Sequence, residues 1–185
     1  MKGFNSGASR GISFARKRRT RRMPLSQIVF FSRNQIRLAG GSMREMVKDI
    51  LTACNRYDRV SGLTGALVFN DHFFLQAMEG ERAAISEQLW KLAADNRHSG
   101  MVLMSSRPIE QRDFEGWMVG FAGHSDALDA IYMDYGATPK LDPSAMPVQS
   151  AIKLLRAFAH LDGGHFVQKS GAGPIVPKDP ARRGA

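Results

Sequence analysis

The sequence has a single cysteine, Cys54, among its 185 residues, so no disulfide can form within the chain. Disulfides stabilise many secreted proteins and are rare in reducing compartments, and the sequence therefore favours a cytoplasmic location. Long apolar runs are also missing. The longest ones, such as 63–69 and 101–104, fall far short of the roughly 20 residues that a membrane-spanning helix needs, so no such helix is predicted.

Motifs of enzyme active sites are scarce as well. The sequence contains no Gly-x-Ser-x-Gly turn, no P-loop, and no recognisable Cys–His or paired-carboxylate arrangement. His160 and His165 lie five positions apart with glycines between them, which matches neither helical nor finger-type metal spacing and offers no third ligand. We therefore expect neither an enzyme nor a metal site.

Acidic residues are absent from the first 23 positions, where eight Lys and Arg residues gather. The rest of the chain carries 18 basic and 17 acidic residues, so most of the net charge of +9 belongs to this segment. Its basic run at 16–22 is suited to phosphates or anionic lipids but not to reading a base sequence. We expect residues 1–23 to be a disordered basic tail that binds nucleic acid only non-specifically, or to precede a true start at Met23.

Beyond this segment, the spacing of apolar residues predicts an ordered core of alternating strands and helices. Ser42 is a predicted helix N-cap, and Asn70-Asp71 is a predicted hairpin turn. The order βαββαββ is typical of an α+β, ferredoxin-like sandwich with two helices on one sheet face. The expected strands are 27–31, 62–69, 72–78, 101–105 and 117–122, and the expected helices are 42–54 and 83–94.

The pattern changes after Gly123. Residues 127–132 and 148–160 are predicted helices joined by a linker at 139–147, and the second has one apolar face that we expect to cover the free face of the sheet. Residues 163–185 are rich in Gly and Pro and predict disorder. The expected organisation is a basic tail (1–23), a main domain (24–123), a C-terminal helical extension (124–162) and a disordered tail (163–185).

Four short runs at compatible spacing carry a family resemblance. Residues 61–67 read Ser-Gly-Leu-Thr-Gly-Ala-Leu, residues 73–80 read Phe-Phe-Leu-Gln-Ala-Met-Glu-Gly, residues 95–98 read Asp-Asn-Arg-His, and residues 112–117 read Arg-Asp-Phe-Glu-Gly-Trp. Together they resemble the motifs of the BLUF family over roughly residues 25–123. The resemblance implies a domain that binds FAD between its two helices and reports blue light through rearranged hydrogen bonds around the flavin ring.

Several positions are assigned through this resemblance. Gln76 matches the glutamine that faces the flavin and switches its hydrogen bonds, since a carboxamide both donates and accepts. Lys91, Arg97 and His98 match the positions where the second helix directs polar groups toward the ribityl and phosphate part of the cofactor. Trp117 matches a tryptophan that is able to donate an electron, although a buried indole also serves as core packing.

Three positions depart from the family pattern. Phe30, two residues before Ser32, replaces the tyrosine that supplies an electron and a proton to the excited flavin, and a phenyl ring has no hydroxyl. Asp58 replaces the asparagine that clamps the flavin, and an ionised aspartate only accepts hydrogen bonds. Val119 replaces a methionine that commonly follows the tryptophan by two. We expect flavin binding to be weakened and normal photoswitching to be impaired.

Two functions of different class follow. The first is a flavin-binding sensory or regulatory protein of the short BLUF type, which has no fused enzyme and acts by contacting a downstream protein. The second is a flavin-free module that keeps the fold for interaction or dimerisation. Neither the partner nor the oligomeric state is specified by the sequence, and a homo-oligomer is compatible with both.

Overall fold

A computed structural model describes residues 24–36, 42–161 and 167–169, apart from the side chains of residues 57–60 and 167. Its framework is a six-stranded mixed sheet with the strand order β4-β1-β3-β2-β5-β6. The strands are β1 (Leu25–Asn34), β2 (Thr64–Phe69), β3 (Phe73–Glu81), β4 (His98–Ile109), β5 (Trp117–Phe121) and β6 (Val167–Lys169). The helices are α1 (Met43–Ser61), α2 (Arg82–Ala93), α3 (Asp126–Tyr135) and α4 (Val148–His160), with a short 3-10 helix at Pro143–Ala145.

Two interleaved βαβ units build the sheet. β1 and β2 both run antiparallel to β3, which lies between them, and β3 and β4 both run antiparallel to β1. The helices α1 and α2 make the two crossovers. β2 and β5 are parallel neighbours, and β6 pairs antiparallel with β5. This topology confirms the expected α+β, ferredoxin-like fold.

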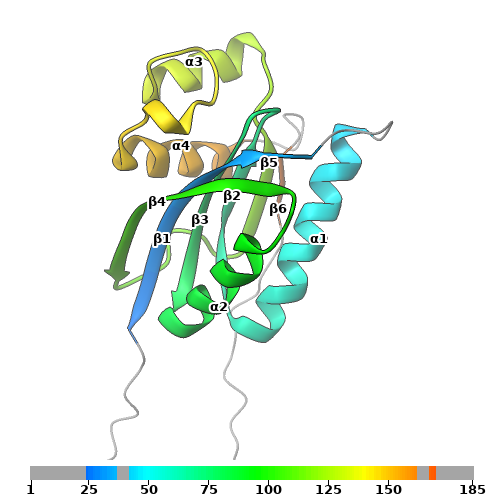
Figure 1. Ribbon diagram of the computed structural model, residues 1–185. Coiled ribbons are helices and arrows are strands. Elements are labelled where there is room, and N and C mark those ends of the chain that lie inside the picture. The colour runs from blue at the N-terminus through cyan, green and yellow to red at the C-terminus, as the bar shows by residue number, and fades with distance from the viewer. Residues whose placement is uncertain (1–23, 37–41, 162–166, 170–185) are drawn as a thin grey trace, which may run out of the picture.

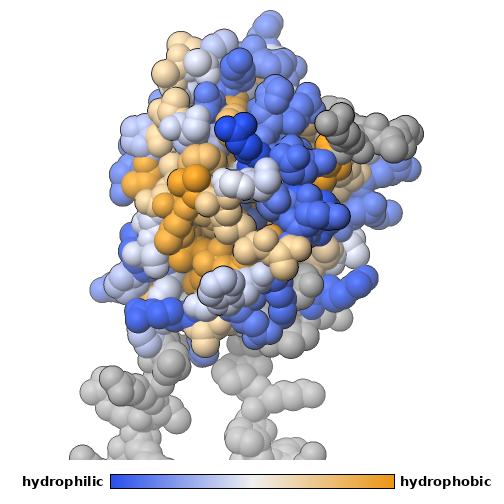
Figure 2. Space-filling view, viewed as in Figure 1, coloured by the Kyte–Doolittle hydropathy of each residue, from blue (hydrophilic) through white to orange (hydrophobic). Residues whose placement is uncertain are grey.

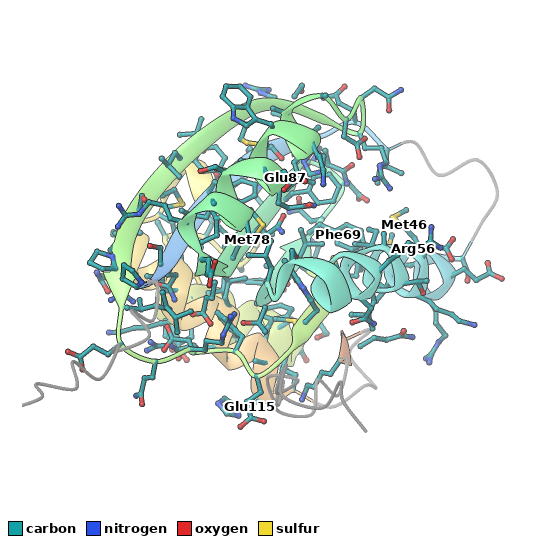
Figure 3. The ribbon with its side chains drawn as sticks, turned by 90° about the horizontal axis from the view of Figure 1, so that it is seen from below. Met46, Arg56, Phe69, Met78, Glu87 and Glu115 are labelled. Atoms are coloured by element: carbon teal, nitrogen blue, oxygen red, sulfur yellow. The ribbon has the colours of Figure 1, made fainter. Side chains whose placement is uncertain are left out.

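The two faces of the sheet carry two separate apolar cores because side chains alternate along each strand. One core joins the sheet to α1 and α2, which lie on the same side of it (Figures 1 and 3), and includes Phe30, Leu67 and Val119. The opposite core includes Val29 and Val68 and is covered by α3 and α4. α4 has the predicted bounds and covers the predicted face.

The start of α1 is fixed by a reciprocal cap. The Ser42 hydroxyl accepts a hydrogen bond from the Glu45 amide at 3.2 Å, and the Glu45 carboxylate accepts one from the Ser42 amide at 3.0 Å. This pair satisfies two of the four amides that a helix start leaves without partners. The predicted N-cap is confirmed.

Gly65 in β2 is required by a close approach between strands. A Cβ atom at this position would lie 2.1 Å from the Ala77 carbonyl oxygen and 3.1 Å from Cζ3 of Trp117. Because the first neighbour is backbone, no side-chain rotation relieves the clash. The glycine of the Leu-Thr-Gly run therefore lets β2 and β3 pair beneath the indole.

The structure corrects several expected boundaries. β4 runs from His98 to Ile109 and extends beyond the predicted strand 101–105 at both ends, because this partly exposed strand is held by backbone pairing with β1 and its side chains need not alternate. The 3-10 helix lies within the predicted linker. β6 falls inside the predicted disordered tail, because main-chain pairing with β5 requires no apolar pattern. The rest of that tail and the basic tail 1–23 lie outside the described residues.

None of the described helices combines the length and apolar character that crossing a membrane requires.

Candidate functional site

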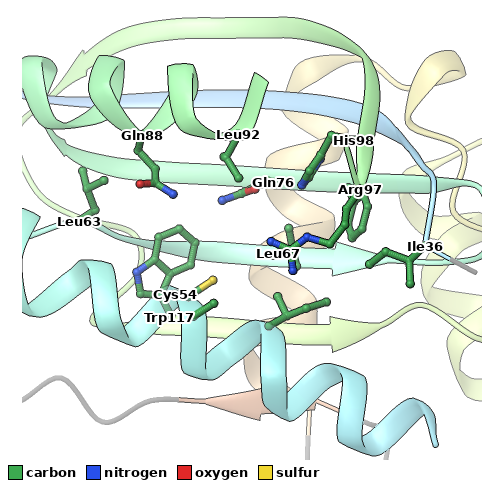
Figure 4. A pocket seen from close by; sticks show the side chains of 13 residues that line it. Ile36, Cys54, Leu63, Leu67, Gln76, Gln88, Leu92, Arg97, His98 and Trp117 are labelled. Carbon is green, nitrogen blue, oxygen red and sulfur yellow. The ribbon is translucent and has the colours of Figure 1, made fainter. Parts of the chain in front are cut away.

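A pocket opens between α1 and α2 over the centre of the sheet (Figure 4). The space between its walls is about 620 Å³, a volume that includes space open to solvent. Its walls are mostly apolar, with four polar side chains among them. The lining residues are Ile36, Ile50, Ala53, Cys54, Leu63, Leu67, Phe74, Gln76, Gln88, Leu92, Arg97, His98 and Trp117.

Gln76 lies on β3 in the middle of the pocket, between the side chains of the two helices (Figure 4). Its side chain is only 4% exposed, and it makes no hydrogen bond to any residue within the described part of the chain. The carboxamide atoms of Gln76 are not among the fully buried polar atoms that lack a partner, so they reach the open space of the pocket. The pocket therefore presents a donor and an acceptor to whatever fills it.

The predicted photoswitch positions line up across the sheet. Phe30 on β1 and Leu67 on β2 are the direct neighbours of Gln76, and Val119 on β5 is the neighbour of Leu67. All four belong to the face that carries α1 and α2, and Phe30 is 1% exposed. Phe30 and Gln76 are therefore brought side by side, as the family resemblance implies for the two positions.

One end of the pocket is formed by His98 and the residues around it. The His98 ring lies 4.5 Å from the Phe74 ring between centroids, and its Nδ1 is 2.8 Å from the Ser32 hydroxyl. Ser32 is fully buried. Burial lowers the pKa of His98, while Asp95 acts to raise it and Arg97 to lower it. His98 and Ser32 thus form one hydrogen-bonded unit at the pocket wall.

The cationic positions behave differently from one another. Arg97 lines the pocket and is half exposed, and its Nε donates to Asp95 at 3.0 Å. Lys91 is not among the lining residues, and its ammonium pairs with Glu87 at 2.7 Å on the surface of α2. Arg97 is therefore a pocket residue, whereas Lys91 is a rim residue at most.

Two further positions complete the sequence-based set. Trp117 on β5 is 3% exposed and lines the pocket floor beside Gly65. Asp58 belongs to α1, but its side chain is outside the described residues, so its role stays a prediction.

The family pattern described as sensors of blue-light using FAD (BLUF) matches residues 25–120, which is more than half of the chain. The chain belongs to the BLUF family. Its family is thus one of blue-light sensors. No curated protein sequence matches the chain.

Two solved structures resemble this chain over nearly the whole of their own length. The structure titled as the dark state of the BLUF protein BlrB is 26% identical, with a TM-score of 0.58, and the match covers 72% of this chain and 96% of that one. The photo-activated state of BlsA is 18% identical, with a TM-score of 0.62, covering 75% and 96% of the two chains. The likeness to BlsA shows the fold.

The residues of this BLUF pocket fit a flavin. A planar apolar ring suits the walls between α1 and α2, and the carboxamide of Gln76 offers the hydrogen bonds that a flavin edge requires. Arg97 at the pocket margin offers a positive charge for a phosphate or ribityl group. The carboxamide of Gln76, which lines the pocket and has no hydrogen bond to another described residue, is the observation that favours this fit.

The opposite face of the BLUF sheet holds a buried polar cluster that the sequence did not predict. Glu79 on β3 is fully buried, and its carboxylate accepts hydrogen bonds from Gln27 Nε2 at 2.7 Å and from the amides of Asp113 and Phe114 at 3.0–3.1 Å. Burial raises the pKa of Glu79 although these donors act to lower it. In the sequence, the glutamate within an otherwise apolar strand is the signal that could have indicated this cluster.

The same cluster reaches α4. Arg156 on α4 contacts the Asp113 carboxylate at 2.6 Å, and Gln27 donates to that carboxylate at 2.8 Å. Burial acts to raise the pKa of Asp113, but the hydrogen bonds from Arg156 and Gln27 outweigh it and hold the pKa below its usual value. Because Glu79 and Gln76 are three residues apart on β3, the cluster ties the pocket strand to the C-terminal helices.

Proposed function

We propose that this BLUF protein binds FAD in the α1–α2 pocket and acts as a sensory or regulatory module through contact with another protein, with its normal blue-light switch impaired. The observation that carries the proposal is the pairing of Phe30 with Gln76 across β1 and β3. At this place the family resemblance implies a tyrosine, whose hydroxyl is the group that phenylalanine lacks.

Binding rests on residues that are retained. Gln76 is positioned for hydrogen bonds to a flavin edge, and Arg97 lies at the pocket margin. When bound, FAD supplies blue-light absorption and an electron-accepting excited state. Trp117 lines the same pocket and is the remaining aromatic electron donor among the motif positions. It donates no proton through a hydroxyl, so electron transfer from it favours quenching over switching.

Impairment rests on three side chains. Phe30 neither supplies a proton nor hydrogen-bonds Gln76, so the carboxamide loses the protein partner that would fix its orientation. An ionised Asp58 replaces one donor with a negative charge, and an unmatched contact of this kind weakens binding by about 1–3 kcal/mol. Val119 fills its place on β5 with a shorter side chain than methionine.

Output through protein contact is proposed because the chain offers no catalytic motif of its own. The Glu79, Gln27, Asp113 and Arg156 cluster gives β3 a direct route to α4, which covers the face away from the pocket. A change in the pocket that displaces β3 would therefore be transmitted to α4 through these contacts.

The test is an absorption spectrum of the full chain, expressed with ample flavin and recorded before and during blue illumination. We expect a bound-flavin spectrum without a reversible red shift in the wild type. The double variant Phe30→Tyr, Asp58→Asn is expected to retain more flavin and to gain the shift. A colourless but folded wild-type protein would favour the flavin-free interaction module instead, and a red shift in the wild type would refute the impaired switch.

A further inference from the structure

An apolar groove lies between α2 and β4, on the far side of α2 from the flavin pocket. Its lining residues are apolar except for one serine, and we refer to it as the α2–β4 groove. They are Phe30, Ser86, Leu89, Trp90, Ala93, Met101 and Leu103. Figure 2 shows apolar side chains gathered over this part of the surface. Phe30 forms its base, so the groove and the β1–β3 pair that holds Gln76 share one side chain.

The groove is bordered by apolar side chains that face solvent. Four large apolar residues are strongly exposed among those the structure describes, and two of them line the groove: Trp90 at 77% and Leu103 at 56%. Exposed apolar residues scattered singly need no explanation, but a contiguous group marks an interaction surface. The other two lie on the opposite face of the sheet: Val102 is paired with Phe31, and Met133 belongs to α3, which covers that face.

β4 also presents an open strand edge. It is the terminal strand in the sheet order and pairs only with β1 among the described strands, although it is 12 residues long. Proteins usually protect such edges with charged residues or prolines. Residues 99–106 contain neither, although the pairing of β4 with β1 shifts its register twice and Pro108 lies near the end of the strand. The unpaired main-chain groups of this edge are therefore available to another strand.

We propose that a second copy of this chain pairs with β4, so that two sheets join edge to edge about a twofold axis and each copy packs Trp90 and Leu103 against the other. Antiparallel pairing of a strand with itself is compatible with twofold symmetry, and the uncharged centre of β4 brings no like charges together. Each apolar side chain counts twice in such an interface, once from each copy.

The available surface is adequate for a stable dimer. Twelve residues extend about 40 Å along the strand. A tryptophan side chain adds roughly 150–250 Å² when it is covered. A strand edge of this length, together with Trp90 and the groove, is of the order of the 800 Å² per partner that specific interfaces bury.

The experiment is to measure the molar mass of the full chain by light scattering and sedimentation from low to high micromolar concentration. We expect a dimer whose dissociation constant rises about tenfold or more in Leu103→Lys, because two like charges would meet near the axis. Met133→Lys is the matched control, since it adds the same charge at a similarly exposed apolar residue on α3 and should leave the dimer unchanged.

A second variant separates the interface from folding. Trp90→Glu changes a side chain that is 77% exposed, so it should keep the thermal transition of the wild type while weakening the dimer to a similar degree. A monomeric wild type at high micromolar concentration would overturn the proposal, as would a dimer that tolerates both variants. Dissociation by salt alone would also overturn it, because it would assign the association to charged segments.

Discussion

Restoring a hydroxyl at position 30 tests the pairing on which the proposed function depends, even without flavin. Phe30 is 1% exposed and lies directly opposite Gln76, whose side chain has no protein hydrogen bond within the described residues. Side chains paired in this way have Cβ atoms about 4.5–5.5 Å apart, so a tyrosine hydroxyl and the carboxamide are within reach of one another. We therefore expect Phe30→Tyr and Gln76→Leu to be energetically coupled.

The size of the coupling follows from the burial of both groups. A new hydrogen bond between the hydroxyl and Gln76 contributes about 0.5–1.5 kcal/mol to the free energy of unfolding, whereas a buried hydroxyl without a partner costs about 1–3 kcal/mol. Phe30→Tyr should thus be close to neutral or stabilising in the wild-type background and destabilising in Gln76→Leu. The expected coupling energy is about 1–2 kcal/mol, above the error of a double-mutant cycle.

Urea unfolding of the flavin-free protein, followed by circular dichroism, measures all four members of the cycle. Phe31→Tyr is the control, because Phe31 is the next residue on β1, lies opposite Leu75 and packs against the core on the other face. It should show no coupling to Gln76→Leu. A coupling below about 0.3 kcal/mol for position 30 would mean that the hydroxyl turns into the α2–β4 groove, and the reasoning about the pair would be refuted.

Three further changes test the frame around the pocket. Glu79→Gln should flatten the pH dependence of the thermal midpoint. Because the pKa of Glu79 is raised in the folded state, this residue stabilises the fold most below pH 4.5, and the stabilisation is lost as pH rises through the raised pKa. Parallel curves of thermal midpoint against pH for the two proteins would contradict this. Arg156→Met should lower the free energy of unfolding by about 1 kcal/mol, because its ion pair with Asp113 is only partly exposed to solvent. Lys91→Ala removes a surface ion pair and should have no measurable effect in the same urea titration. Gly65→Ala should destabilise by more than about 2 kcal/mol through the backbone clash, and a thermal midpoint equal to that of the wild type would contradict the close strand approach.

Sequence patterns predicted the parts of the fold where local chemistry and burial agree. Ser42 was identified as a cap because a hydroxyl before an apolar helical run has one common use, and α4 kept its predicted bounds because a single apolar face runs along its length. β4 was underestimated, since a strand at the sheet edge needs no alternating pattern. β6 was missed because three residues held by main-chain bonds leave no signal in composition.

The site was predictable only where motif and geometry coincide. Gln76 and Phe30 were identified by the resemblance, but apolar periodicity alone specifies no register, so their direct pairing is a finding of the structure. The cluster around Glu79 was missed because its members come from distant parts of the chain: Gln27 on β1, Asp113 before β5 and Arg156 on α4. Their spacing in the sequence does not predict that they are in contact.

The position of β1 in the sheet sets the order in which this protein can fold. β1 is the first of the described strands to be synthesised, yet both of its neighbours, β3 and β4, come later in the chain. Among the described strands, only β2 and β3 are joined by a tight hairpin, and the pairings of β1 close long loops, which slows folding. During translation, residues 25–34 must therefore wait without one strand partner until residue 109 has left the ribosome, and their apolar run is exposed to chaperones or to aggregation for that interval.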